Sequence, residues 1–358
     1  MKNIPKLKLH IVGGARPNFI KIAPLIRLLD KDKYFLTKFI NTGQHYNSKL
    51  YDKILVDLKL RSPDINLNVG SFSGNTQISK IMYRYEKYLK ENTPDMVIVF
   101  GDVNSTLASA LTAKKMGIKL AHIEAGLRCY DDGLPEEVNR RLTDSVSDYF
   151  FTPSPNEKIN LKKENITKNI FFVGNIMIDS LKIILNENKK IEDRFVKNYG
   201  LITLHRPENV DNLEQFSRII DKLEEISKKI NLIFPIHPRT KKSLRKFNLI
   251  KKIRSIKNIK ITNSFGYIEF LRHVKHSEFV ISDSGGVQEE TSILGIPCFT
   301  LRKNTERPIT ITKGNNQLVN LKNIISKVNL RKKKKIIIAK WDGKTAERIV
   351  KVLKSISI

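Results

Sequence analysis

Short runs of β-branched and aromatic residues alternate with amphipathic segments of helical length, and this alternation constrains the fold more than any other feature. The runs are continuously hydrophobic, as in strands buried on both faces, so the pattern predicts parallel sheets covered by helices. Strands are expected at residues 7–12, 35–41, 96–100, 119–123, 149–152, 170–173, 200–204, 231–236, 258–262, 279–282 and 297–301. Helices are expected between them, for example at residues 17–30, 74–91, 104–116, 136–147, 211–229 and 285–294.

The 358 residues exceed what one ordinary core organises, at roughly 150 residues per domain, so two doubly wound, Rossmann-like α/β domains are expected. Pro153 and Pro155 punctuate the chain between the two sets of strands. We expect an N-terminal domain over residues 1–167 and a C-terminal domain over residues 168–340, followed by a helix in residues 341–358 that packs back onto the N-terminal domain. Ligands of such folds bind beyond the carboxyl ends of the strands.

The composition is that of a globular chain, with 40% hydrophobic and 28% charged residues. No apolar run approaches the ~18 residues of a membrane span. The short apolar run before Gly13 does not suit a signal peptide. Cys129 and Cys298 are the only cysteines, which excludes a disulfide scaffold and a cysteine-rich metal site. A cytoplasmic protein is therefore expected.

The net charge of +29 is unevenly distributed, with +8 in residues 1–180 and +21 in residues 181–358. Residues 239–260 carry ten basic side chains and no carboxylate, and residues 331–335 are an unbroken basic run. Such a surface can bind nucleic acid or an anionic membrane, and this non-enzymatic function stays an alternative. A generally lysine-rich composition also explains the charge. Because no zinc-finger, helix-turn-helix or RNP pattern accompanies it, no specific nucleic-acid partner is predicted.

The first strand-to-helix turn combines tight backbone geometry with positive charge. Gly13 and Gly14 permit a tight bend, and Pro17 suits the first turn of a helix. Arg16 and Lys21 add positive charge where the N-terminus of the helix attracts an anion. An ordinary turn with exposed basic residues is the structural alternative.

Carboxylates follow the other strands of the N-terminal domain. Asp102 and Glu124 come at two strand ends, and Glu136 lies in the first turn of an expected helix. Asp102 could instead cap a helix, and Glu136 could pair with Arg140 four residues later. Since one domain supplies all three carboxylates, they are candidates for acid and base groups with separate roles.

The C-terminal domain offers two histidines and a glycine-containing turn. His205 and His237 each follow a strand. Ser284, Gly285 and Gly286 lie between a strand and a helix, where backbone N–H groups can cradle a phosphate. The segment matches neither a Walker loop nor G-x-G-x-x-G, so it favours a nucleotide-sugar over ATP or NAD.

Ten segments, in order and over nearly the whole chain, resemble the non-hydrolysing UDP-N-acetylglucosamine 2-epimerases. They are GARPNFIK (14–21), TGQH (42–45), GDVNSTLA (101–108), HIEAGLR (122–128), PEEVNR (135–140), LHRPENVD (204–211), PIHPR (235–239), SDSGGVQEE (282–290), TERP (305–308) and DGKTAERI (342–349). The resemblance implies a glycosyltransferase-B fold, in which two domains face a cleft, and a homodimer. It implies inversion of C2 of a UDP-sugar: UDP is eliminated to leave a 2-acetamidoglucal and adds back after a proton reaches the other face of C2. No cofactor and no metal are expected.

The resemblance also implies roles for individual residues. Asp102, Glu124 and Glu136 match the catalytic carboxylates, and His205 matches a histidine near the diphosphate and the reacting sugar. Sequence does not distinguish the base from the acid among the carboxylates. Glu290 matches a ribose contact and Phe270 a position near the uracil. The full set of implied substrate-binding residues is Arg16, Lys21, Arg140, His237, Phe270, Ser284, Gly285, Gly286, Glu290 and Arg307.

Two departures from the family bear on substrate and regulation. Ala15 and Asn18 stand in GARPN, where many members have GTRPE, and this form is also similar to relatives that act on 2,3-diacetamido uronates or deoxy sugars. Asn47 stands where activated bacterial members have a glutamine, three residues after the position of Gln44, so allosteric activation by a second UDP-GlcNAc is not predicted. Conversion of UDP-GlcNAc to UDP-ManNAc for cell-surface polysaccharides is the leading expectation. A modified UDP-sugar, a hydrolysing 2-epimerase and a glycosyltransferase of the same fold stay open as alternatives.

Overall fold

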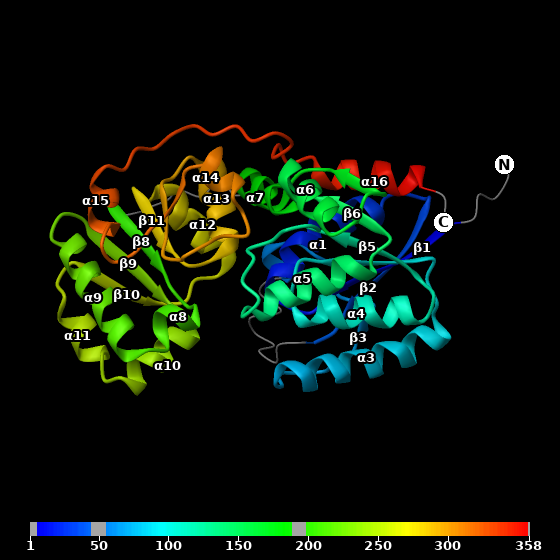
Figure 1. The fold of residues 1–358 in the computed structure, drawn as a ribbon, viewed down its shortest axis with the longest axis horizontal. Helices are drawn as coiled ribbons and strands as arrows, with labels where there is room; N and C mark the ends of the chain where they lie inside the picture. The colour runs from blue at the N-terminus through cyan, green and yellow to red at the C-terminus, as the bar shows by residue number, and fades with distance from the viewer. Residues whose placement is uncertain (1–5, 44–54, 188–197, 357–358) are drawn as a thin grey trace. The chain divides into compact units, whose positions relative to one another are not determined.

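The computed structural model describes residues 6–43, 55–187 and 198–356. Gln44, His45 and Asn47, which the sequence analysis singled out, lie outside these ranges. The chain forms two compact units (Figure 1). Unit 1 comprises Met1–Asn186 and Ala339–Ile358, and unit 2 comprises Glu187–Ile338.

Among the described residues, the sheet of unit 1 has seven strands in the order β3-β2-β1-β4-β5-β6-β7, and every neighbouring pair is parallel. The strand order reverses between β1 and β4, and in doubly wound folds this is where the turns at the carboxyl ends form a site. The strands are β1 Leu7–Gly13, β2 Phe35–Asn41, β3 Ile65–Asn66, β4 Met96–Phe100, β5 Lys119–Ile123, β6 Tyr149–Thr152 and β7 Ile170–Phe172.

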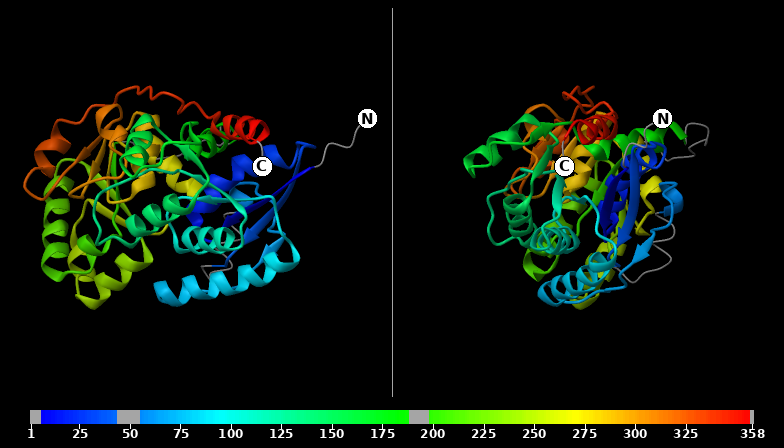
Figure 2. Two further views of the ribbon diagram at one scale, coloured as in Figure 1. Left: turned by 45° about the vertical axis from the view of Figure 1, so that its right-hand side comes forward. Right: turned by 90° about the vertical axis from the view of Figure 1, so that its right-hand side faces the viewer.

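Helices cover both faces of this sheet (Figure 2). α3 buries Ile81, Tyr85 and Leu89 at four-residue spacing, so that one stripe of the helix packs against the sheet beside α4, and α4 in turn contacts α5. α1 and α16 pack against each other on the opposite face. The helices are α1 Arg16–Leu29, α3 Gly74–Glu91, α4 Asn104–Lys115, α5 Pro135–Val146, α6 Pro155–Lys163, α7 Ile176–Glu187 and α16 Thr345–Ser355.

The C-terminal segment belongs to unit 1 through specific contacts. The indole Nε1 of Trp341 donates to the carbonyl of Pro153 at 3.0 Å. Asp179 in α7 accepts the backbone N–H groups of Thr345 (3.1 Å) and Ala346 (2.7 Å), the first residues of α16. The two hydrogen bonds to Asp179 satisfy N–H groups at the start of α16 that have no partner inside the helix.

The division between the units differs from the expected one. The sequence analysis began the C-terminal domain at residue 168, whereas β7 pairs with β6 and extends the sheet of unit 1, which continues to Asn186. The physical reason lies in Pro155, which occupies the first position of α6, where its missing N–H costs nothing, and does not mark a linker.

In the described part of unit 2 the sheet has six parallel strands in the order β10-β9-β8-β11-β12-β13, and its order reverses between β8 and β11. The strands are β8 Tyr199–Thr203, β9 Asn231–Ile236, β10 Ile259–Asn263, β11 Phe279–Ser282, β12 Cys298–Thr300 and β13 Asn316–Leu318. The helices are α8 Pro207–Val210, α9 Leu213–Ser227, α10 Pro238–Lys246, α11 Ile250–Ser255, α12 Tyr267–His276, α13 Gly285–Leu294, α14 Ile309–Thr312 and α15 Ile324–Asn329.

Unit 2 has a separate hydrophobic core on each side of its sheet. On one side α9, α10, α11 and α15 contribute buried residues such as Phe216, Leu244 and Ile253. On the other side α12 and α13 contribute Val274 and Val287. Two α/β units, each with helices on both faces of a parallel sheet, confirm the predicted fold class.

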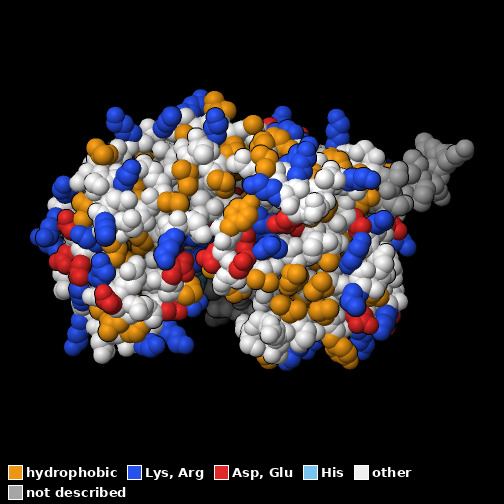
Figure 3. Space-filling view, in the orientation of Figure 1, with side chains coloured by type: hydrophobic (Ala, Val, Ile, Leu, Met, Phe, Trp, Pro, Cys, Tyr) orange, Lys and Arg blue, Asp and Glu red, His pale blue; other side chains and the backbone are white. Residues whose placement is uncertain are grey.

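Basic side chains are spread over the surface. On the face shown in Figure 3, lysines and arginines are scattered over both units, with acidic side chains among them. Among the residues that the structure describes, no helix combines the length and the apolar character needed to cross a membrane.

Candidate active site

The turn after β1 is held by a buried asparagine. Asn18 Oδ1 accepts the N–H groups of Gly14 (3.2 Å) and Ala15 (3.1 Å), while its amide donates to the carbonyl of Phe100 at the end of β4 at 2.9 Å. Asn18 thus joins the two turns that flank the reversal of strand order. These hydrogen bonds occupy the N–H groups of Gly14 and Ala15, which belong to the turn that the sequence analysis expected to attract an anion.

Lys21 and Glu124 form a buried ion pair over the turn after β4. The Lys21 ammonium donates to Glu124 Oε2, and the two side chains are only 6% and 5% exposed. Both groups lie against Gly101, whose φ is +62°; a Cβ there would lie 2.9 Å from Lys21 Nζ and 3.0 Å from Glu124 Oε2. The turn therefore needs glycine for its backbone conformation and for the close approach of these charges.

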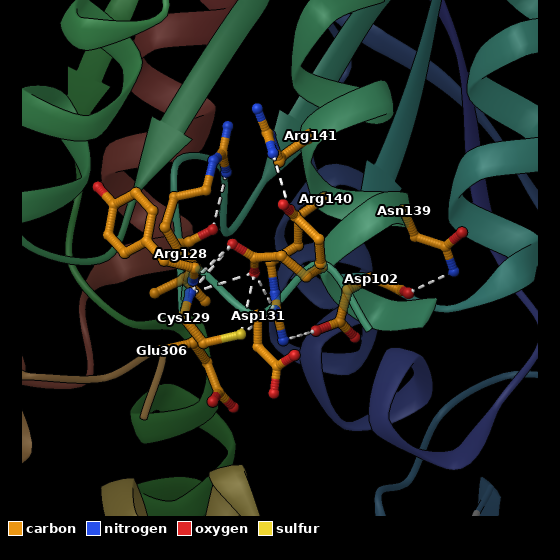
Figure 4. Close-up of polar contacts among 12 residues, drawn as sticks. Asp102, Arg128, Cys129, Asp131, Asn139, Arg140, Arg141 and Glu306 are labelled. Carbon is orange, nitrogen blue, oxygen red and sulfur yellow. Dashed lines mark hydrogen bonds and ion pairs between the residues drawn. The ribbon is translucent and has the colours of Figure 1, made fainter. Parts of the chain in front are cut away.

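Asp102 is tied to α5 by Arg140. Arg140 NH2 lies 2.5 Å from Asp102 Oδ2, and its NH1 lies 2.7 Å from Glu137 Oε2 (Figure 4). The amide of Asn139 donates to the backbone carbonyl of Asp102 at 2.8 Å. α5 thus supplies two anchors for the turn after β4, and the Asp102 side chain keeps 22% of its surface exposed.

Glu136 and Arg16 lie at the starts of two helices of unit 1. Glu136 is in the first turn of α5 and is partly buried. Arg16 is the first residue of α1 and is exposed. Unit 1 therefore brings together four of the predicted residues around the turn after β4: Lys21, Asp102, Glu124 and Arg140.

In unit 2, His205 is oriented by a buried aspartate. Its Nδ1 lies 3.1 Å from Asp283 Oδ1. Asp283 also accepts the backbone N–H groups of His205 and Arg206 and the amide of Asn209. Burial by itself raises the pKa of the Asp283 carboxyl, but the His205 ring and the surrounding donors outweigh it and hold the pKa below its usual value. The ring of His237 lies beside that of His205, with centroids 5.0 Å apart.

The predicted phosphate turn is the N-terminus of α13. Ser284 is the N-cap residue, and Gly285 and Gly286 are the first helical residues, whose N–H groups have no intrahelical acceptor. A Cβ on Gly285 would lie 2.6 Å from Arg307 NH1 and 2.6 Å from Glu306 Oε1. The glycine therefore allows the Arg307 guanidinium to approach the helix terminus.

Two buried carboxylates hold Arg307 in this position. Its Nε lies 2.7 Å from Glu289 Oε1, and its NH1 pairs with Glu306. Glu306 also pairs with Arg302 at 2.9 Å. The cluster alternates cations and anions, which compensates the cost of burying them.

Glu290 and Phe270 lie on adjacent helices of unit 2. Glu290 Oε1 accepts a hydrogen bond from the Tyr267 hydroxyl at 2.8 Å. Phe270, on the same helix as Tyr267, is partly buried against the core that α12 and α13 share. Within the described ranges, no group of three or more His, Cys, Asp or Glu side chains is arranged to hold a metal ion.

The sequence analysis missed Asn18, Glu137 and Asp283. Helical periodicity could have found Glu137, because Glu137, Arg140 and Asp144 recur at positions i, i+3 and i+7 of α5, and all three are buried. Asp283 directly follows a strand, as Asp102 nearly does, and that position was a usable signal. Nothing in the sequence indicates the contact of Asn18 with Phe100, because 82 residues separate them.

Comparison with known proteins supports the resemblance. The model of the UDP-N-acetylglucosamine 2-epimerase family matches residues 27–354. The UDP-N-acetylglucosamine 2-epimerase of Methanocaldococcus jannaschii is 45% identical, over 97% of this chain and 99% of that protein. The UDP-2,3-diacetamido-2,3-dideoxy-D-glucuronate 2-epimerase of Pseudomonas aeruginosa is 33% identical, over 87% of this chain and 88% of that protein.

A solved structure agrees with these matches. The M. jannaschii UDP-GlcNAc 2-epimerase, crystallised with UDP-GlcNAc and UDP, superposes with a TM-score of 0.92 at 44% identity, over 98% of this chain and 100% of that one. The predicted fold type, two doubly wound units as in the glycosyltransferase-B fold, is confirmed. The chain is a member of the UDP-N-acetylglucosamine 2-epimerase family.

Proposed function

We propose that this protein is an isomerase that inverts C2 of a UDP-N-acetylhexosamine and converts UDP-GlcNAc to UDP-ManNAc without net hydrolysis. The observation that carries the proposal is the group of carboxylates and cations around the carboxyl ends of β4 and β5, in a chain 45% identical to a UDP-N-acetylglucosamine 2-epimerase. The product would supply the synthesis of cell-surface polysaccharide.

Unit 1 would supply the acid–base groups. One carboxylate among Asp102, Glu124 and Glu136 removes the C2 proton while the bond from C1 to the diphosphate oxygen breaks. The products of this step are a 2-acetamidoglucal and UDP. Another carboxylate then delivers a proton to the opposite face of C2, and the diphosphate oxygen re-forms its bond to C1. Lys21 and Arg140 hold two of these carboxylates in fixed positions.

Unit 2 would hold the nucleotide. The N–H groups at the start of α13 and the Arg307 guanidinium offer positive charge to the diphosphate. Glu290 and Phe270 are assigned to the ribose and the uracil. His205, fixed by Asp283, would stabilise the departing diphosphate so that it stays in place for re-addition.

The test is incubation in D₂O with UDP-GlcNAc and, separately, with the UDP-2,3-diacetamido uronate and deoxy sugars. NMR of the anomeric region and of C2 identifies the sugar that reacts. We expect one deuterium at C2 of the product and no accumulation of free UDP. Product with protium at C2 would contradict the mechanism. Free UDP that rises in proportion to ManNAc would show a hydrolysing 2-epimerase instead.

Amide variants of the three carboxylates test whether each takes part in the reaction. Asp102→Asn, Glu124→Gln and Glu136→Gln should each lower turnover by ~10²-fold or more, as expected for the loss of a general acid or base. UDP affinity, measured by calorimetry, should be largely retained, because its proposed contacts are in unit 2. Near-normal rates in all three variants would sink the assignment.

We further propose that the protein works as a homodimer, as the family resemblance implies. Light scattering of the purified protein should give twice the mass of the chain. A monomer that retains full activity would refute this assembly.

A further inference from the structure

His122 lies in β5 with its side chain fully buried, and both of its ring nitrogens face hydrogen-bond acceptors. Nδ1 lies 2.7 Å from Asp144 Oδ1 in α5. Nε2 lies 2.8 Å from the carbonyl oxygen of Gly101 in the turn after β4. A carbonyl oxygen can only accept, so Nε2 must carry a proton.

The state of Asp144 decides whether Nδ1 carries a proton as well. Asp144 Oδ2 accepts from Arg128 NH1 at 2.7 Å and from the N–H of Gly126 at 3.0 Å. Burial by itself raises the pKa of Asp144, but the Arg128 guanidinium and the N–H of Gly126 favour the ionised carboxylate, and the pKa lies below its usual value. An ionised Asp144 also can only accept, and Nδ1 must then donate to it.

The contacts of Arg128 keep this cluster electrically balanced when His122 is protonated. Arg128 pairs with Asp144 and, through NH2 at 2.6 Å, with Glu164. With a protonated His122, two cations and two carboxylates alternate along the chain of contacts.

The hydrogen bond from His122 Nε2 is made to the turn that positions the proposed acid–base groups. Gly101 directly precedes Asp102, and the charged ends of Lys21 and Glu124 lie against the Cα of Gly101. If the carbonyl of Gly101 rotated, Asp102 would turn with it, because they share a peptide bond. The Lys21–Glu124 pair would then lose its packing contact with Gly101.

We propose that His122 is a buried imidazolium that positions the Gly101–Asp102 turn for catalysis, with Asp144 and Arg128 holding its charge. His122 is thus a positioning residue and not one that touches the substrate. The catalytic part of this inference rests on the proposed epimerase function, whereas the doubly protonated ring does not.

The protonation state is measured first, on the unaltered protein. Nitrogen-15 labelling of the histidines and a long-range proton–nitrogen spectrum at pH 7.5 should show one ring with protons on both nitrogens. Exposed histidines, with a pKa near ~6.5, are mostly neutral at this pH. A spectrum without a doubly protonated ring would overturn the proposal, whatever the protein catalyses.

Two variants then separate the two hydrogen bonds of the ring. His122→Gln places an amide nitrogen near the position of Nε2 and keeps a donor for the Gly101 carbonyl. His122→Asn places one near the position of Nδ1 and keeps a donor only for Asp144. Both remove the ring and its charge, so each is the matched control of the other.

We expect kcat to fall by ~10²-fold in His122→Asn, as for a misplaced catalytic group. In His122→Gln the fall should be about tenfold or less, and KM should change less than about threefold in both. Equal losses of kcat in both variants, with the same thermal stability, would overturn the positioning role. If neither variant folds, the nitrogen-15 spectrum of the unaltered protein decides. If the unaltered protein has no epimerase activity, the proposed function fails, and the spectrum still tests the imidazolium.

Discussion

At the scale of single residues, the site depends on groups that hold the proposed catalytic residues in place. Asp283 accepts from the His205 ring and from two successive backbone N–H groups, so it fixes both the ring and the turn that carries it. Asn18 and Arg140 act in the same way on the turns after β1 and β4. Such supporting contacts preorganise a site before the substrate arrives.

Asp283→Asn should therefore impair catalysis through His205. An asparagine offers one acceptor oxygen in place of two, so it cannot accept all the donors that Asp283 holds. We expect kcat to fall by ~10²-fold in the wild-type background and by less than about threefold in a His205→Ala background. Additive losses in the double variant would contradict a role exerted through His205.

Gly285→Ala should weaken UDP binding. The added Cβ would lie 2.6 Å from Arg307 NH1 and from Glu306 Oε1, so the ion pair must move away from the start of α13. We expect the Kd of UDP, measured by calorimetry, to rise about tenfold, or ~1.4 kcal/mol. Gly74→Ala is the matched control, because a Cβ at Gly74 meets no atom within 4 Å. Unchanged UDP affinity in folded Gly285→Ala would remove this turn from the nucleotide site.

At the scale of elements, the first N–H groups of α16 donate to the carboxylate of Asp179, and the pKa of this carboxylate is unusual. Burial raises the pKa of Asp179 to about 6, although it accepts hydrogen bonds from Ala346 and Thr345, which lower it. The ordinary value in an unfolded chain is about 3.8. Between these two values the folded protein binds the proton more tightly than the unfolded chain does. The free energy of unfolding contributed by Asp179 therefore falls as the pH rises from about 4 to about 6.

Asp179→Asn should remove this dependence. The difference in unfolding free energy between wild type and variant should fall by at most roughly 3 kcal/mol from pH 4 to pH 6 and stay constant above pH ~7. Urea denaturation followed by the fluorescence of Trp341, the single tryptophan, measures it. Asp342→Asn serves as a contrast: Arg348 lowers the pKa of Asp342, so its contribution is lost only as the pH falls below about 4. A difference for Asp179→Asn that rises with pH over this window would contradict the prediction.

The elements also show what sequence could and could not predict. Continuous hydrophobic runs such as 96–100 and 279–282 were identified with their observed bounds. β3 and β13 were missed because two or three residues are too short to show a period. The turns of the site were located from polar residues at strand ends. Glu137 and not Glu136 faces inward, because Glu137 accepts the N–H of Cys129 and pairs with Arg140 of the same helix, and helix propensity does not reveal these contacts.

At the scale of the whole molecule, unit 1 is discontinuous in sequence. Its last helix buries Ile349 and Leu353, and Trp341 precedes it in the same segment. Each such side chain contributes roughly 1.5–3 kcal/mol on burial. Their sum is comparable with the whole stability of a typical domain, about 5–15 kcal/mol.

Deletion of residues 339–358 should therefore unfold unit 1 and leave unit 2 folded. Hydrogen exchange followed by mass spectrometry should show loss of protection in α1 and β7 and retention in β8 and β11. A synthetic peptide of residues 339–358 added in trans should restore protection as a control. Full protection of α1 in the truncated chain would contradict the expected dependence on α16.

The position of α16 has a consequence for synthesis on the ribosome. Domains of multidomain chains generally fold from the N-terminus as they emerge. Here the order is reversed, because unit 2 has all of its residues once Ile338 has emerged, whereas unit 1 lacks its last helix until Thr345–Ser355 has emerged. During translation, unit 1 therefore cannot complete its fold until unit 2 has been synthesised. The apolar surface that later packs against α16 stays exposed to solvent during this time.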